Sequence, residues 1–278
     1  MTLLVRDEAD IVRANLDFHL ARGVDFVIAT DNRSEDGTVE ILEEYERRGA
    51  LHLIHEPADD YSQGRWVTRM ARLAATDFGA DWVINSDADE FWCARAGTLS
   101  SVLAAVPADC DAVLAPRYNF VVPAGPDERP FHERMLVRYA VPFDPVNERP
   151  IQPKMAHRAS AEAQVLQGNH DVQWPGRAGV LDDTPIEILH FPIRTLAQFE
   201  NKIAKGGAAY ERNEELPEHF GHRWRSLFDA QRRGEFTAVF ERVRLSPAAV
   251  AQGLESGELV SDRRVADACL RVAGPDRG

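Results

Sequence analysis

The segment DWVINSDADEFWC, residues 81–93, places Asp87, Asp89 and Glu90 just beyond a run that is typical of a buried strand. Carboxylates this close repel one another, and removing them from water costs on the order of several kcal/mol unless a cation or a donor compensates. In extended chain, Asp87 and Asp89 point to the same side, and their oxygens are ligands that Mg²⁺ or Mn²⁺ prefers. The pattern indicates a divalent-cation site, with a solvated acidic turn as the alternative for so short a motif.

Composition restricts the partners of this chain. Its length of 278 residues, of which 44% are hydrophobic, fits one large domain or one domain with an appendage. Its net charge is −13. An acidic field repels nucleic acid and anionic membranes, so an anionic substrate must meet a local positive patch or a metal. The three scattered cysteines form no CxxC pair, and no apolar leader or membrane-length run is present. We therefore expect a cytoplasmic protein with no nucleic-acid partner and no transmembrane segment.

The first hundred residues alternate between strand-like and helix-like segments. Strands are expected at 2–5, 24–30, 51–56 and 81–86, and helices at 9–20, 39–48 and 65–78. This order predicts right-handed βαβ units and a parallel sheet covered by helices. Ligands of such sheets bind beyond the carboxyl ends of the strands, where Asp7, Asp31, Glu56 and Asp87 fall.

The pattern changes after about residue 100. The segments CDAVLAP, RYNFVV, ERMLVRY, PIQPKMAHR, AQVLQG and IEILHF are typical of strands with Pro- and Gly-rich loops, whereas helical patterns dominate from Thr195 onwards. We therefore predict an α/β domain over 1–194, with a nucleotide-binding half at about 1–97 and an acceptor-side half at about 98–194. A C-terminal helical extension, 195–278, follows.

An ordered set of motifs carries a family resemblance. The segments RDEADIVRANLDFHLARGVDFVIATDNRSEDGT, WVINSDADEF and IEILHFPIRTLAQFENKIAKGG together resemble the family 2 type glycosyltransferases of the GT-A fold, over roughly residues 1–210. The resemblance implies a Rossmann-like, mainly parallel sheet flanked by helices. It also implies a nucleotide-sugar donor, favoured as a UDP-sugar, a Mn²⁺ or Mg²⁺ ion, and a carbohydrate or other hydroxyl-bearing acceptor.

The same resemblance implies roles for individual acids and a histidine. Asp89 would bind the metal that bridges the donor diphosphate, and Asp87 would face the ribose and the metal. His190 would supply a further metal ligand, since neutral imidazole coordinates Mn²⁺ beside carboxylates. Asp31 would accept a hydrogen bond from uracil N3–H, and a turn or cap role in DNRSEDGT is the alternative.

Basic residues complete the expected donor site. Arg69 matches the family's basic residue on the nucleotide side, and Lys202 and Lys205 would neutralise the diphosphate leaving group from a lid-like helix. Ordinary solvated helix surfaces are the alternative for all three.

The catalytic base is expected in the segment GNHDVQW, which makes Asp171 and His170 the candidates and Trp174 a possible platform for a sugar ring. The family's usual Glu-Asp and Gln-x-x-Arg-Trp patterns are absent, so the stereochemistry stays open. A polar bend between strands is the alternative for this segment.

Two other functions remain open at this point. A sugar-1-phosphate nucleotidyltransferase would normally begin with a Gly-rich basic phosphate loop, where this chain has the acidic VRDEAD. A non-catalytic carbohydrate-binding protein on the same fold would show no hydrolysis of a nucleotide-sugar. The chain lacks the GxGxxG, P-loop, GxSxG and HExxH motifs of other common enzyme classes.

Overall fold

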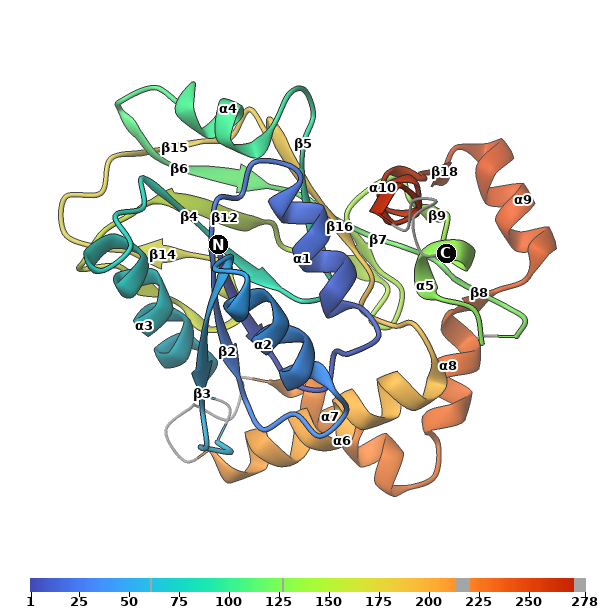
Figure 1. Cartoon of the computed structure of the whole chain (residues 1–278). Coiled ribbons are helices and arrows are strands. Elements are labelled where there is room, and N and C mark those ends of the chain that lie inside the picture. The colour runs from blue at the N-terminus through green and yellow to red at the C-terminus, as the bar shows by residue number, and fades with distance from the viewer. Residues whose placement is uncertain (61, 127, 214–220, 273–278) are drawn as a thin grey trace, which may run out of the picture.

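The computed structural model describes residues 1–60, 62–126, 128–213 and 221–272, and a seven-stranded sheet lies at its centre (Figure 1). In spatial order the strands are β15 (Gly179–Leu181), β6 (Cys110–Ala115), β12 (Lys154–Arg158), β4 (Trp82–Asp87), β1 (Thr2–Val5), β2 (Val27–Asp31) and β3 (Leu51–His55). β4, β1, β2 and β3 are parallel, and β12 is antiparallel to both of its neighbours. The predicted mixed, mainly parallel α/β fold is confirmed.

The parallel half forms because buried strands alternate with amphipathic helices. β2 is buried along its whole length, as expected of a strand that is covered on both faces. The helices of the parallel half are α1 (Val12–Leu20), α2 (Thr38–Arg47) and α3 (Gln63–Thr76). In α3, Trp66, Val67 and Met70 are buried at helical spacing. The strands and helices predicted for this half are all present, with ends shifted by a few residues.

A small second sheet begins where β4 ends. Its spatial order is β5 (Glu90–Ala94), β16 (Ile186–His190) and β7 (Arg117–Asn119), and only Ala88 and Asp89 separate β4 from β5. Glu90, His190 and Asn119 lie in register in one row across these three strands. Phe91 is fully buried next to this row and packs against the rings of Phe18, Phe131 and Phe191. This apolar anchor fixes the acidic segment at the edge of the core.

Short elements make up most of the acceptor-side half. They are α4 (Leu99–Ala104), β8 (Val122–Pro123), α5 (Phe131–Arg134), β9 (Val137–Tyr139), β10 (Phe143–Asp144), β11 (Arg149–Pro150), β13 (Gln164–Val165), the 3₁₀ helix η1 (Gln167–Asn169) and β14 (Val172–Gln173). β10 pairs with β11 and β13 with β14 in antiparallel hairpins. The segment ERMLVRY is predicted as a strand, but its first two residues are the end of α5, the helical turn that follows Pro130. Only its last three residues form a strand, β9. Pro fixes the backbone that starts such a turn.

The C-terminal segment is helical, as predicted, and packs back onto the sheet-containing part. It contains α6 (Leu196–Arg212), α7 (His222–Arg232), α8 (Phe236–Val243), β17 (Arg244–Leu245), α9 (Pro247–Ser256), β18 (Leu259–Ser261) and α10 (Arg264–Val272). β17 pairs with β8 and β18 pairs with β9. Figure 1 shows α6 and α7 side by side along the bottom of the molecule. Across residues 1–60, 62–126, 128–213 and 221–272, no helix is long and apolar enough to span a bilayer.

Two adjacent glycines allow α6 and α7 to approach closely. A Cβ atom added to Gly206 would lie 2.5 Å from the ring of Trp224, and one added to Gly207 would lie 2.5 Å from Phe228. Real side chains do not tolerate such contacts, so only glycine permits this packing. The pair in the KGG segment thereby sets where α6 passes over the carboxyl ends of the strands.

Candidate functional site

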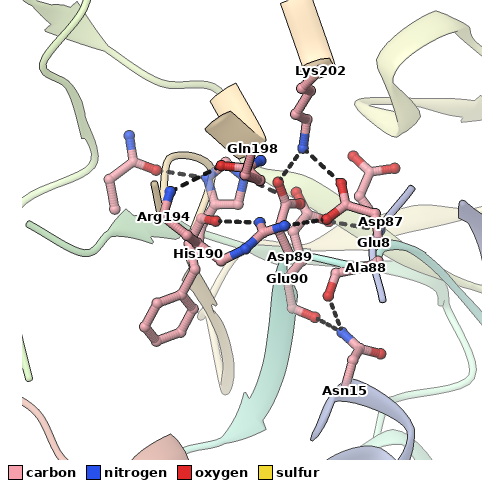
Figure 2. Close-up of polar contacts among 12 residues, drawn as sticks. Glu8, Asn15, Asp87, Ala88, Asp89, Glu90, His190, Arg194, Gln198 and Lys202 are labelled. Carbon is pink, nitrogen blue, oxygen red and sulfur yellow. Dashed lines mark hydrogen bonds and ion pairs between the residues drawn. The ribbon is translucent and has the colours of Figure 1, made fainter. Parts of the chain in front are cut away.

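The acidic turn, Asp87–Glu90, is held from two sides by backbone contacts. The Asn15 side chain, on α1, donates hydrogen bonds to the carbonyl oxygens of Ala88 (2.9 Å) and Glu90 (2.7 Å) (Figure 2). From the other side, the backbone N–H of Phe191 donates to the Asp89 carbonyl at 2.9 Å. Asn15 is fully buried, so the turn is fixed before any ligand arrives.

Lys154 neutralises one side of the acidic turn. Its ammonium lies 2.6 Å from Asp87 Oδ2 and 2.7 Å from Glu90 Oε2, and both Lys154 and Glu90 are fully buried. Burial raises the pKa of Asp87, and the charge of Lys154 opposes that effect without overcoming it. Burial also disfavours the Glu90 carboxylate, but Lys154 and Arg117 outweigh it and lower the pKa. Sequence reasoning missed Lys154, because its place on β12 beside β4 depends on antiparallel pairing 67 residues beyond Asp87.

Lys202 neutralises the other side. Its ammonium lies 2.6 Å from Asp89 Oδ2 and 3.1 Å from Glu8 Oε1 (Figure 2). Burial disfavours the charged amine, yet Asp89 and Glu8 raise its pKa, so it stays an ammonium. The fully buried Arg194 binds Glu8 and Asp10 and also donates to the Phe191 carbonyl. Alternating charges from Asp10 to Asp89 thus form one continuous network.

Two lysines compensate the carboxylates of the acidic turn. They supply the cations that allow four carboxylates, those of Glu8, Asp87, Asp89 and Glu90, to be close together. Asp87, predicted also to bind the metal, is held instead by Lys154 and by Asn169 Nδ2 at 3.3 Å. Lys202, which we predict to neutralise the diphosphate, contacts the carboxylates of Glu8 and Asp89 at the edge of a cavity.

His190 and Asp89 form a different kind of pair. The Nδ1–H of His190 donates to Asn119 Oδ1 at 2.6 Å, and Asn119 Nδ2 in turn donates to the Phe143 carbonyl at 2.8 Å, which fixes the orientation of the amide. Burial lowers the pKa of His190, and Asp89 does not compensate, so the ring is neutral and Nε2 carries a lone pair. That atom lies 3.5 Å from Asp89 Oδ1.

Two acceptor atoms that face each other favour a cation between them. A metal-binding histidine characteristically donates its other ring N–H to an oxygen, as His190 does to Asn119. The donor set of Asp89 and His190 therefore fits a divalent metal, with further ligands left to a phosphate-bearing substrate and water. In the part of the chain that the structure describes, no group of three His, Cys, Asp or Glu side chains has metal-binding geometry.

A cavity of about 730 Å³ opens beyond the carboxyl ends of β1 and β4. Asp87, Asp89 and His190 line it on the sheet side, and Lys202 and Lys205 line it from α6. Lys205 binds Asp7 and also Glu35, at 2.7 Å from the latter. The acidic turn is therefore on the wall of a hollow large enough for a nucleotide-sugar.

Comparison with known proteins identifies the family. The model of glycosyl transferase family 2 matches residues 6–178, which is more than half of the chain. This protein belongs to glycosyl transferase family 2. As a glycosyltransferase of this family it transfers a sugar from a nucleotide-sugar donor, and the nucleotidyltransferase alternative is wrong.

Solved structures of low similarity accompany that match. S. aureus TarS is 14% identical, with a TM-score of 0.44, over 83% of this glycosyltransferase and 42% of the TarS chain. TarS 1–349 in complex with UDP-GlcNAc is 12% identical, with a TM-score of 0.45, over 99% of this chain and 92% of that one. The glycosyltransferase thus spans about two fifths of the first of these chains. A search of curated protein sequences gave no significant match.

On the nucleotide side of the glycosyltransferase, Asp31 and Arg69 differ in their surroundings. Asp31 ends β2 and is buried; Oδ2 accepts from the Ser34 N–H at 3.3 Å, whereas Oδ1 is buried and has no partner among the described residues. Asp31 itself does not line the cavity, but its neighbour Asn32 does. Arg69 is half-exposed, pairs with Glu56 at 3.1 Å and does not line the cavity. Asp31 is therefore the better candidate for a contact with the base.

The two candidate bases of the glycosyltransferase point in different directions. The Asp171 carboxylate binds Arg177 at 3.1 Å and Gln173 at 3.2 Å, and Asp171 does not line the cavity. His170 does line it, and its Nδ1 hydrogen-bonds the Pro153 carbonyl at 3.1 Å, which leaves Nε2 as an acceptor. The expectation that Asp171 faces the reaction needs correction, because Arg177 holds it outside.

Proposed function

We propose that this protein transfers a sugar from a UDP-sugar to an acceptor hydroxyl, with Mn²⁺ or Mg²⁺ held by Asp89 and His190. The observation that carries the proposal is the 3.5 Å approach of His190 Nε2 to Asp89 Oδ1, with Asn119 fixing the ring, on the wall of the cavity. A divalent cation bound there supplies positive charge that stabilises a diphosphate leaving group. Lys202, next to the same carboxylate, adds a permanently charged ammonium.

The preference for uracil rests on Asp31. A buried carboxylate oxygen without a hydrogen-bond partner loses the solvation that water would give it, at a cost of about 1–3 kcal/mol. Uracil N3–H is a donor that removes this cost, whereas the corresponding edge of cytosine presents an acceptor. A uridine nucleotide therefore complements the end of β2, whereas a cytidine nucleotide does not.

His170 is the proposed general base. Burial, followed by the charges of Arg117 and Lys154, lowers its pKa to about 4, so the ring is neutral at pH 7 and Nε2 can accept a proton. A bound diphosphate adds negative charge to the cavity and thereby raises this pKa toward the working range. The acceptor oxygen attacks the anomeric carbon, its proton passes to Nε2, and the bonding electrons of the breaking C–O bond leave with the diphosphate.

A donor screen and two variants test this proposal. Calorimetric titration with UDP, GDP, CDP and ADP in the presence of Mn²⁺ should give the tightest binding for UDP. His170→Ala should lower kcat about 100-fold or more at saturating donor with little change in donor KM, and Asp171→Asn should change kcat by less than about threefold. Preferential binding of another nucleotide refutes the donor assignment. Collapse of kcat in Asp171→Asn alone returns the base to that residue.

A further inference from the structure

Three arginines line the cavity on the side formed by the acceptor-side half and α7. They are the arginine cluster, Arg117 on β7, Arg149 on β11 and Arg223 at the start of α7. Arg117 lies two residues before Asn119 on the same strand, so both side chains point to the same face of the small sheet, as does His190. The arginine cluster therefore lies near Asp89 and His190. The nucleotide side, where Asn32 lines the cavity, is a different part of the wall.

Most hydrogen-bond donors of the arginine cluster are unused within the described part of the chain. A guanidinium has five N–H donors. Arg117 makes one hydrogen bond, to Glu90 at 3.1 Å, and its buried Nε has no partner there. The side chain of Arg149, an exposed residue, makes no hydrogen bond or ion pair with any described residue, and the buried Nε of Arg223 is also without a partner among them.

The one carboxylate beside Arg223 is already engaged. Asp144 Oδ2 lies 3.6 Å from the Arg223 guanidinium, which is too long for a hydrogen bond. Its two oxygens accept from the Val146 N–H at 3.0 Å and from Asn147 Nδ2 at 2.7 Å, and these bonds stabilise the turn between β10 and β11. Asp144 therefore makes its hydrogen bonds within the β10–β11 hairpin, and it balances the charge of Arg223 only weakly.

The charges of the three guanidiniums act on one another. Burial lowers the pKa of Arg223, and after the opposing effect of Asp144 the charges of Arg117 and Arg149 lower it further. Arg117 also lowers the pKa of His170, the proposed base. Glu90 and Asp144 balance only part of the positive charge of the three arginines, and the remainder, next to the base, is where an anionic part of the acceptor would be stabilised.

We infer that the arginine cluster binds an oxyanion, a phosphate or carboxylate group, carried by the acceptor. This inference rests on the proposed glycosyl transfer and names the class of acceptor it uses. Arginine recognises both groups with paired hydrogen bonds, and here three arginines line the cavity from three separate elements. An acidic protein that takes an anionic acceptor requires such a local positive surface.

The test uses the full chain saturated with UDP and Mg²⁺, so that the diphosphate position is filled. Inorganic phosphate and acetate are titrated by calorimetry into the wild-type protein, Arg149→Gln, Arg223→Gln and the control Arg233→Gln, which removes a charge from the exposed end of α7. We expect at least one of the two anions to bind the wild type and Arg233→Gln alike. Arg149→Gln and Arg223→Gln should weaken that binding about tenfold or more. The stronger anion tells phosphate from carboxylate.

Two results overturn the inference. One is that neither anion binds the UDP-loaded wild-type protein. The other is that Arg149→Gln and Arg223→Gln weaken UDP itself while anion binding is retained, which assigns the arginines to the donor diphosphate. Unchanged thermal unfolding of the variants shows that they are folded. Failure of the proposed function is distinct, because the anion titration without nucleotide still reports the arginine cluster when UDP does not bind.

Discussion

The two walls of the cavity carry opposite charges. On the acidic wall each carboxylate is paired with a cation of the protein, whereas the charges of the arginine cluster are paired only in part. On the acidic wall, Glu8, Asp87 and Asp89 each contact a lysine ammonium within 3.1 Å, and Arg194 supports Glu8 from behind. In the arginine cluster, only Arg117 has a hydrogen-bonded partner among the described residues. Balanced charges hold geometry, whereas unbalanced ones are available to a ligand.

Removing a lysine that pairs with the carboxylates of the acidic wall should have the largest effect on stability. Lys202→Met leaves the buried carboxylates of Glu8 and Asp89 without their shared cation, and the free energy of unfolding should fall by about 3–5 kcal/mol. Lys205→Met is the matched control on the same helix. Its partner Glu35 is largely exposed, and its other partner Asp7, whose side chain is buried, keeps hydrogen bonds from the Glu35 N–H and from Asn201 Nδ2, so the loss of Lys205 should cost less, about 1–2 kcal/mol. Urea denaturation measures the free energy of unfolding of both variants. An equal loss of stability in Lys202→Met and Lys205→Met would contradict this prediction.

The support beneath the acidic turn should show itself in the pH dependence of stability. His19 is fully buried; its Nδ1–H donates to the Asn15 carbonyl at 2.8 Å and its Nε2 accepts from the Trp92 N–H at 2.9 Å. Burial lowers its pKa to about 4. Between about pH 6.5 and 4 the unfolded chain therefore binds a proton that the folded one does not, and stability falls with falling pH, by about 3 kcal/mol for this residue.

Nuclear magnetic resonance of the histidine rings checks that prediction at single-residue level. The His19 ring should stay neutral down to about pH 5, as expected for a group whose folded-state pKa is depressed. Denaturation by urea across the same range should show the accompanying loss of stability. A His19 ring that titrates with a midpoint near its ordinary value of about 6.5 would mean that the hydrogen bonds to Asn15 and Trp92 do not hold it neutral.

A smaller effect is expected on the nucleotide side, where one acceptor is open. Asp31→Ala removes the unpaired Oδ1 and should weaken UDP binding by about 1–3 kcal/mol, with little change in metal dependence. Arg69→Gln is the control, because Arg69 pairs with Glu56 outside the cavity and its loss should leave UDP affinity unchanged. Calorimetry with UDP separates the two. If Asp31→Ala binds UDP as the wild type does, Asp31 is a turn residue.

Sequence reasoning reached the elements of the parallel half because each obeys a local rule. Apolar runs of strand length and helices with one buried face are visible within a few residues, and the strand-end position of Asp87 followed from them. The motif resemblance also predicted His190 as a metal ligand with Asp89, and the two side chains lie 3.5 Å apart, while the metal role stays a prediction.

Contacts between distant segments could not be predicted in this way. Glu8 and Arg194 are 186 residues apart, and their pairing depends on where α6 crosses the strand ends. His170 lines the cavity while Arg177 holds Asp171 outside it, and no local sequence rule predicts which of two consecutive loop residues faces a cavity. The arginine cluster comes from three separate elements and has no motif, so only the folded chain brings it together.

The effect of Mn²⁺ on UDP binding tests the central claim most directly. Calorimetric titrations of the wild-type protein and His190→Gln are compared with and without Mn²⁺. We expect Mn²⁺ to strengthen UDP binding about tenfold or more in the wild type, and His190→Gln to lose most of this gain while its metal-free UDP affinity is retained. A wild-type affinity for UDP that does not change with Mn²⁺ would contradict the assignment of Asp89 and His190 as a metal site.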